Sequence, residues 1–289
     1  MLKKEEINIR DPFVLLADGK YYMTGTAGAD AWAGGSHFPV YISDDLENWE
    51  GPIRAFEKPE GFWAEDNFWA PEIHAYKGAY YMFASFHNQA KNRASQIMRA
   101  EKPEGPYAVW STPITPDDWY SLDATFHVDE EGQPWAVFCH EWTQIGTGEI
   151  CAVKLSEDLK GTIGEPITLF AASDAKWVTP NEEKLIAGKK CMVTDGPFIV
   201  KDEGGLTMFW SSFSNGNYAE GMAVSESGSV LGPWKQIAEP LFEKDGGHGM
   251  LFKTKEGKLM FSLHRPNLNP MERPAFFEVK RENGAYKIV

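Results

Sequence analysis

Five short apolar runs in this chain each turn back at a glycine-containing tetrad and continue as a second apolar run. The turns are centred on Gly19, Gly78, Gly132, Gly204 and Gly257. Segments rich in Val, Ile, Phe, Tyr and Trp, bounded by Gly, Pro, Asn and Asp, are typical of β-strands joined by turns. Helical periodicity is scarce, and the most helix-like window, residues 181–187, is short and is interpreted as a connector. The repeat therefore predicts an all-β fold built from five similar units.

The spacing of the turns indicates how the units are arranged. Successive turn glycines are 59, 54, 72 and 53 residues apart. A four-stranded propeller blade with its turns needs about 40 to 50 residues, and insertions account for the rest. Five blades closed into a ring avoid the exposed sheet edges of an open array. No linker or shift in composition interrupts the repeats, so we expect residues 1–289 to form a single five-bladed β-propeller domain.

Composition excludes several classes of protein. Hydrophobic residues make up 43% of the chain and charged residues 24%, which excludes a disordered chain. The formal net charge of -14 disfavours nucleic acid and anionic membranes as partners. The sequence contains neither a membrane-spanning apolar stretch nor a secretory signal, so we expect a cytoplasmic protein. Three cysteines without CxxC spacing predict neither a disulfide framework nor a zinc site.

A distinctive polar residue stands before each turn. Asp11 precedes its turn glycine by 8 residues, Asp123, Asp195 and His248 precede theirs by 9, and Glu72 is closer at 6. In a propeller the first strand of each blade lines the central channel, so equal positions on these strands meet at one end of the axis. The nearly equal offsets therefore predict that these residues converge in one funnel.

Convergent carboxylates suit a particular chemistry. Like charges in a partly desolvated pocket raise one another's pKa, so one group stays protonated near neutral pH while another remains ionised. Glycoside cleavage needs such a pair, with an acid to protonate the leaving oxygen and a base to activate water. Asp-Pro and Asp-Gly-Pro sequences also form ordinary turns. The shared offset is what favours a site for Asp11, Asp123 and Asp195.

Five motifs carry a resemblance to a known family. They are Arg10-Asp11-Pro12-Phe13, Trp69-Ala70-Pro71-Glu72, Leu122-Asp123-Ala124, Asp195-Gly196-Pro197 and Gly247-His248-Gly249. Together and in this order they resemble glycoside hydrolase family 43 over nearly the whole chain. The resemblance implies a five-bladed propeller that hydrolyses arabinosides or xylosides with inversion at the anomeric carbon.

The resemblance also implies roles for the acids. Asp11 is similar to the general base that activates water, and Asp123 to the carboxylate that raises the pKa of the general acid and orients it. The acid position falls at Asp195, where the family usually has glutamate. Aspartate is shorter by one methylene, about 1.5 Å, so a glutamate elsewhere could donate the proton. We rank Asp195 first and Glu141 second, and Glu72 is a further candidate.

Other residues complete the expected site. Trp32, in the Gly-rich segment 27–37, either stacks on a sugar ring or holds its own loop. By the resemblance, His248 approaches a hydrated metal ion or contacts substrate, so the central channel could hold Ca²⁺, although one histidine is a weak calcium signature. No cofactor is expected to be required. The expected substrate-binding residues are Glu72, Trp69, Phe13, Trp32, His248 and Arg265. The histidines interpreted as structural or exposed are His74, His87, His127, His140 and His264.

The leading hypothesis is an exo-acting inverting glycosidase for arabinose- or xylose-containing oligosaccharides, of the α-L-arabinofuranosidase or β-xylosidase type. Segments 27–37 and 172–190 could close the funnel around a small oligosaccharide. Three different functions remain open. An endo-arabinanase would need an open groove, and a glycoside phosphorylase or transferase would need more cationic side chains in the funnel than Arg10 and His248. A non-catalytic carbohydrate-binding propeller gains support from the aspartate at the acid position.

Overall fold

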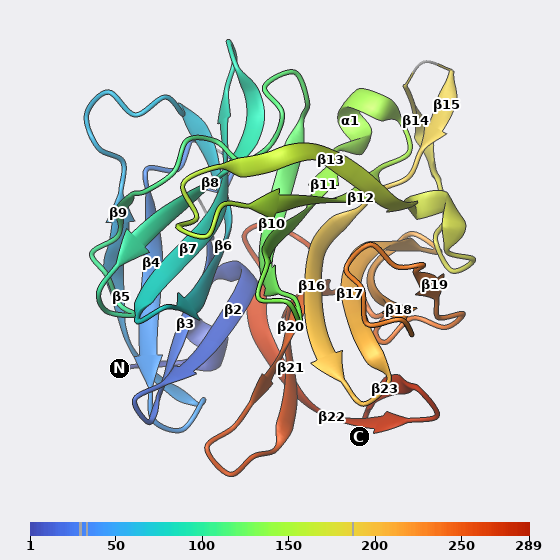
Figure 1. Ribbon diagram of the computed structural model, residues 1–289. Helices are drawn as coiled ribbons and strands as arrows, with labels where there is room; N and C mark the ends of the chain where they lie inside the picture. The colour runs from blue at the N-terminus through green and yellow to red at the C-terminus, as the bar shows by residue number, and fades with distance from the viewer. Residues whose placement is uncertain (29–30, 33, 187) are drawn as a thin grey trace.

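The computed structural model describes residues 1–28, 31–32, 34–186 and 188–289. In this part of the chain, five antiparallel sheets of four or five strands are arranged as the blades of a propeller (Figure 1). The predicted all-β, five-bladed architecture is therefore confirmed. None of the described helices is long and apolar enough to cross a membrane.

Each blade runs from an inner strand outward through successive antiparallel neighbours. Blade 1 contains β2 (Ile9–Ala17), β3 (Lys20–Ala27), β4 (His37–Ser43) and β5 (Asn48–Glu57), with β1 (Leu2–Lys3) added at its outer edge. Blade 2 contains β6 (Asp66–Tyr76), β7 (Ala79–Asn88), β8 (Asn92–Ala100) and β9 (Ala108–Val109). Blade 3 contains β10 (Ser121–Val128), β11 (Pro134–His140), β12 (Glu149–Leu155) and β13 (Thr162–Ala171).

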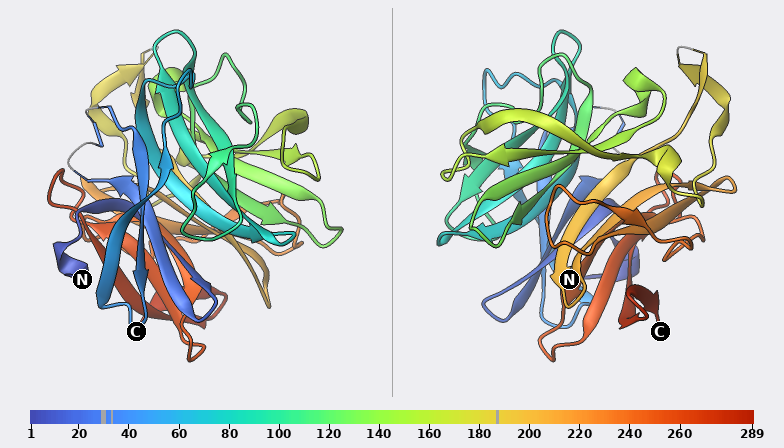
Figure 2. Two further views of the ribbon diagram at one scale, coloured as in Figure 1. Left: turned by 90° about the vertical axis from the view of Figure 1, so that its left-hand side faces the viewer. Right: turned by 45° about the vertical axis from the view of Figure 1, so that its right-hand side comes forward.

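The last two blades follow the same plan. Blade 4 contains β16 (Asp195–Asp202), β17 (Gly205–Ser214), β18 (Asn217–Ser225) and β19 (Lys235–Gln236). Blade 5 contains β20 (Gly247–Lys253), β21 (Leu259–Arg265), β22 (Arg273–Glu282) and β23 (Ala285–Ile288). The described helical segments are short: η1 (Lys4–Glu6), α1 (Trp142–Ile145) and η2 (Ala172–Asp174). β2 lies beside β20 and β21, so the first and last blades meet and close the ring (Figure 2).

The repeated turns join the first and second strands of each blade. Gly19, Gly78, Gly132 and Gly257 have positive φ values between 73° and 83°, which glycine adopts without a steric cost. In the fourth turn the residue with positive φ is Gly205 (109°), one position after the predicted Gly204.

The helix-like window interpreted as a connector lies between blades 3 and 4, but its described residues are extended rather than helical. Residues 181–186 form β14 (Asn181–Ile186), which pairs with β15 (Lys189–Cys191) as a two-stranded hairpin, while residue 187 lies outside the described residues. Pairing across a short turn outweighs a weak helical pattern of one or two turns.

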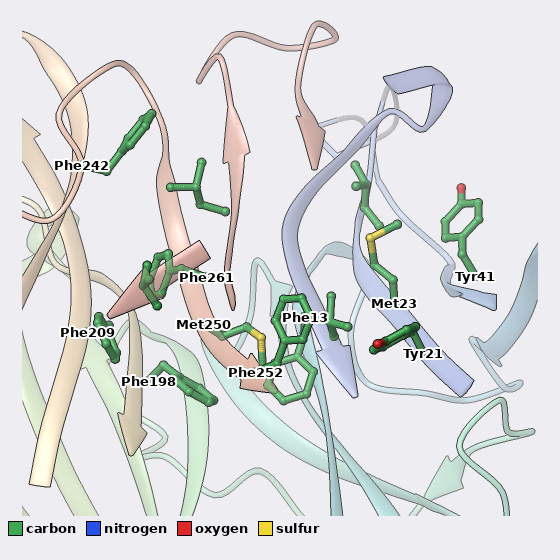
Figure 3. Close-up of a cluster of buried hydrophobic side chains, with 14 of the residues drawn as sticks. Phe13, Tyr21, Met23, Tyr41, Phe198, Phe209, Phe242, Met250, Phe252 and Phe261 are labelled. Carbon is green, nitrogen blue, oxygen red and sulfur yellow. The ribbon is translucent and has the colours of Figure 1, made fainter. Parts of the chain in front are cut away.

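The hydrophobic core lies between the faces of neighbouring blades. One cluster joins blades 1, 4 and 5 through residues such as Phe13, Phe209 and Phe261 (Figure 3). Three further clusters fill the spaces between blades 1 and 2, 2 and 3, and 3 and 4. Burying one such aromatic side chain stabilises the fold by about 1.5–3 kcal/mol. This packing holds the five inner strands, and the side chains that they carry, around one axis.

Candidate active site

A cavity of about 510 Å³ receives side chains from the inner strands of all five blades. Asp11, Trp69, Asp123, Asp195 and His248 come from β2, β6, β10, β16 and β20 in turn. The cavity is also lined by Trp32 and Glu141. The structure therefore brings together seven of the site residues expected from the sequence.

The inner strands share a β-bulge where these residues lie. In each blade the pairing with the second strand shifts at this point. The bulged residue has a positive φ, with values of 54° for Asp11, 45° for Ala70, 59° for Asp123, 50° for Gly196 and 52° for His248. Left-handed conformations are costly for residues other than glycine and are common at functional sites.

The bulge refines the register predicted from turn spacing. The shared structural position, marked by the positive φ, holds Asp11, Asp123 and His248 in blades 1, 3 and 5. In blades 2 and 4 the same position holds Ala70 and Gly196. Asp195 therefore lies one residue before the shared position, and Glu72 lies two residues after it. Counting from turn glycines could not reveal this because the turns differ in length: two residues separate the paired strands in blades 1, 2 and 4, but five separate them in blades 3 and 5.

Hydrogen bonds between blades hold the bulges in place. The bulge leaves a backbone N–H outside the strand ladder, and in four blades a side chain from the second strand of the preceding blade accepts it. The pairs are Asp11 N to His264 Nδ1 (3.2 Å), Ala70 N to Thr26 Oγ1 (2.8 Å), Asp123 N to Ser85 Oγ (2.7 Å) and His248 N to Ser211 Oγ (2.6 Å). These bonds fix the backbone of the site across the seams between blades.

Blade 4 uses the Asp123 carboxylate for the same purpose. The corresponding side chain in blade 3 is Cys139, and a thiol is a weak acceptor. The Gly196 N–H donates instead to Asp123 Oδ2, over 3.1 Å. Asp123 is thus bonded directly to the peptide that follows Asp195, which holds the two acids in a fixed relation.

Asp11 is surrounded by groups that favour its ionised form. The Thr26 hydroxyl donates to Oδ2 over 2.5 Å, and the Nδ1 atoms of His248 and His264 lie 3.2 and 3.4 Å from Oδ1. Burial alone would raise the pKa of Asp11, but the neighbouring His248, His264 and Arg10 side chains together hold it well below its usual range. The carboxylate is therefore ionised at neutral pH and able to accept a proton.

The pKa values of Asp195 and Asp123 are shifted in the opposite direction from that of Asp11. Burial, with repulsion from Glu141 and Asp11, raises the pKa of Asp195 to about 7, against the hydrogen bond that the Tyr218 hydroxyl donates over 3.1 Å. Burial and the charges of Asp195 and Asp11 also raise the pKa of Asp123. Because these buried acids repel each other's charge, the pair retains a proton close to neutral pH.

Glu141 is held in an ion pair. Its Oε2 accepts from Arg93 Nη1, and Arg93 Nη2 donates to Asn67 Oδ1 over 2.8 Å. The guanidinium lies 4.5 Å from the centre of the Trp69 ring, and Trp32 meets the same ring edge-on at 5.0 Å. Glu141 is thus bonded to a cation, whereas the hydrogen bond to Asp195 comes from the neutral Tyr218 hydroxyl.

A sequence model of glycosyl hydrolases family 43 matches residues 6–287. The chain belongs to this family. It is therefore a glycoside hydrolase, as the resemblance implied.

Known proteins support the same family. The crystal structure of an endo-arabinase from Bacteroides thetaiotaomicron VPI-5482 is similar, with a TM-score of 0.90 and 39% identity over 98% of each chain. Extracellular endo-alpha-(1->5)-L-arabinanase 1 of Bacillus subtilis (strain 168) is 25% identical over 253 residues, 83% of this chain and 71% of that protein. Extracellular exo-alpha-(1->5)-L-arabinofuranosidase ArbA of Cellvibrio japonicus (strain Ueda107) is 26% identical over 173 residues, 54% of this chain and less than half (46%) of that protein.

Three expected substrate-binding residues of this family 43 hydrolase do not line the main cavity. Glu72 lies 2.7 Å from His74 in a separate small cavity, and burial raises its pKa. Phe13 packs in the hydrophobic core between blades (Figure 3). Arg265 is exposed and lies over the ring of Phe242. Side chains alternate between the two faces of a strand, so proximity to a motif does not ensure that a residue faces the site.

The described residues form no direct ligand cage for the calcium ion that the central channel could hold. Among the described residues, no group of three or more His, Cys, Asp or Glu side chains is arranged to hold a metal ion. His248 Nδ1 instead faces Asp11 and Asp123, 3.2 and 3.7 Å away. Calcium in the channel stays a hypothesis, and no step proposed below uses it.

Sequence reasoning missed the residues that support the acids. His264, interpreted as structural or exposed, is fully buried and contacts Asp11. Tyr218 and Arg93 were not identified. The sequence contained a signal for some of these supporting residues at the position that lies 7 residues after each turn glycine. This position holds Thr26, Ser85, Cys139, Ser211 and His264.

Proposed function

We propose that this family 43 hydrolase cleaves arabinofuranosyl linkages in arabinose-containing oligosaccharides, with inversion at the anomeric carbon. One observation carries the mechanism: the same cavity holds an acid with a depressed pKa, Asp11, and an acid whose pKa is raised to about 7, Asp195. The arabinose substrate is supported by the relatives, which are named as an endo-arabinase, an arabinanase and an arabinofuranosidase.

In the proposed reaction Asp11 removes a proton from a water molecule that attacks the anomeric carbon. Asp195 gives its proton to the departing glycosidic oxygen on the opposite side. Asp123 and Asp195 together retain the proton that Asp195 donates, and Asp123 holds the adjacent Gly196 amide. Asp11 ends the cycle protonated and Asp195 ionised, and exchange with solvent restores both.

We further propose that the enzyme acts on chain ends. The cavity volume of about 510 Å³ lies within the range of about 300–1,000 Å³ for small-ligand sites. Trp142, next to Glu141, and Leu268, beyond blade 5's second strand, add to its wall. A cavity bounded by all five blades suits one end of an oligosaccharide better than the middle of a polymer.

Endo action is the second candidate, favoured by the 39% identity to an endo-arabinase over 98% of both chains. Linear α-1,5-arabino-oligosaccharides labelled at the reducing end distinguish the two modes. Exo action from the unlabelled end shortens the labelled chain stepwise by a constant unit and releases small unlabelled products, whereas endo action gives short labelled products from the first minutes. The anomer formed first, observed by proton NMR, reports inversion or retention.

Further substrates test xylosidase, phosphorylase and binding functions. An aryl β-D-xyloside tests xylosidase activity, and inorganic phosphate tests phosphorolysis by the formation of a sugar phosphate. Absence of turnover on every arabinoside and xyloside would contradict the proposal and favour a binding propeller. Hydrolysis that disappears in Asp11→Asn would exclude a propeller that only binds sugar.

A further inference from the structure

A buried glutamate outside the cavity supports one side of the site. Glu220, on β18, is fully buried and does not line the main cavity. Its Oε2 accepts a hydrogen bond from Ser211 Oγ over 2.6 Å and another from Gly249 N over 3.0 Å. Ser211 Oγ in turn accepts from His248 N over 2.6 Å. One carboxyl group of blade 4 therefore holds two successive amides of blade 5.

These amides belong to a backbone that needs such support. His248 has a φ of 52°, and the pairing of β20 with β21 shifts between Gly247 and Met250. The bulge leaves the His248 and Gly249 N–H groups outside the ladder, and a buried N–H without an acceptor is destabilising. The Glu220 network supplies the acceptors that the ladder cannot.

The position of the His248 ring depends on this backbone. A Cβ on Gly196 would lie 2.6 Å from His248 Cδ2, so the ring is packed tightly against blade 4 on that side. On the other side its Nδ1 lies 3.2 Å from Asp11 Oδ1 and 3.7 Å from Asp123 Oδ2. A shift of a few tenths of an ångström in the backbone would therefore change the contact with the base.

Blade 1 contains a similar pair of hydrogen bonds through a hydroxyl group, which ends on a different carboxyl group. The Thr26 hydroxyl accepts the Ala70 N–H and donates to the catalytic Asp11. In blade 4 the Ser211 hydroxyl accepts the His248 N–H and donates to Glu220. Burial raises the pKa of Glu220 to about 8, so a neutral amide is a suitable replacement near neutral pH.

We propose that Glu220 is a positioning residue, which through Ser211 and the Gly249 amide fixes the backbone of His248 so that its imidazole contacts Asp11. This inference rests on the proposed role of Asp11 as the base. The groups that face His248 are Arg10, Asp11, Asp123, Glu220 and His264.

The test compares Glu220→Gln with Glu220→Met. Glutamine keeps an acceptor oxygen for both bonds, and kcat should stay within about threefold of wild type. Methionine fills a similar volume without a strong acceptor, and kcat should fall about 10- to 100-fold with KM changed less than about threefold, as expected for a displaced catalytic contact. Ser225→Ala, a buried serine at the far end of β18, is the control and should keep wild-type kcat.

Titration of the His248 ring by NMR gives a readout independent of turnover. Burial lowers the pKa of His248 to about 4 against the raising effect of the Asp11 charge, so a ring displaced from Asp11 in Glu220→Met should titrate at a lower pH than in wild type. A folded Glu220→Met protein with wild-type kcat and an unchanged His248 titration would overturn the inference, as would an equal loss in Ser225→Ala. If wild type hydrolyses no arabinoside, the proposed function fails, but the titration still decides whether Glu220 positions His248.

Discussion

Replacing Asp195 with asparagine tests the assignment of the proton donor. Asparagine keeps the size of the side chain but cannot protonate the leaving oxygen. General acid catalysis contributes about 10²- to 10⁴-fold, or about 2.7 to 5.4 kcal/mol of transition-state stabilisation. We therefore expect kcat/KM on an arabino-oligosaccharide to fall by this factor in Asp195→Asn. A 4-nitrophenyl arabinofuranoside should lose much less, because its leaving group needs little protonation.

The pH dependence follows from the pKa of Asp195, which is raised to about 7. The acid must be protonated to act, so activity is present below pH 7 and is lost as the pH rises. About half of the molecules carry the proton at pH 7 and about 1% at pH 9, which predicts a tenfold loss per pH unit on the alkaline side. In Asp195→Asn this alkaline limb should be absent.

Glu141→Gln is the matched comparison. Glu141 raises the pKa of Asp195 by repulsion, so its neutralisation should move the alkaline limb to lower pH without removing it. The assay is kcat/KM from pH 4 to 10 for wild type and both variants, with circular dichroism to confirm folding. An alkaline limb that persists in Asp195→Asn and disappears in Glu141→Gln would refute the reasoning and make Glu141 the acid.

Three further variants test the supporting residues. Tyr218→Phe removes a 3.1 Å hydrogen bond that favours ionised Asp195, so the alkaline limb should move to higher pH; a downward shift would contradict this. Gly196→Ala places a Cβ 2.6 Å from His248 at a φ of 50° and should lower the free energy of unfolding in urea by about 1–3 kcal/mol; unchanged stability would show that the ring moves freely. Trp32→Ala should raise KM about 2- to 12-fold, the equivalent of about 0.5–1.5 kcal/mol of stacking, at unchanged melting temperature; an unchanged KM would indicate that this ring, 57% exposed, only holds its loop.

The convergence of the three acids was within reach of sequence reasoning, because a repeat brings residues that are far apart along the chain close together at the axis. Asp11, Asp123 and Asp195 each stand near the start of an inner strand, and the structure places all three in one cavity. Phe13 and Glu72 stand in the same motifs yet face elsewhere. Their direction depends on the bulge, which changes the alternation of side chains and leaves no clear mark in turn spacing.

The choice between the two candidate acids needed tertiary contacts. Glu141 is paired with Arg93, which lies 48 residues earlier in the chain, whereas Asp195 is bonded to Tyr218 and repelled by other acids. A pKa is set by burial and by charges a few ångströms away, and neither is a property of the local sequence. The same holds for His264, which contacts Asp11 across the seam between the first and last blades.

The sequence by itself determined the number of blades, the class of fold and the identity of the acids near the axis, because hydrophobic patterning and turn residues act over a few positions. Only the tertiary structure decided which backbone positions are equivalent, which acid keeps a proton and which side chains support them. These features arise where blades meet: the Gly196 amide bonds to Asp123, and the His248 amide bonds to Ser211. Contacts across such seams join segments far apart in sequence, and the free energy of each depends on geometry that forms when the ring closes.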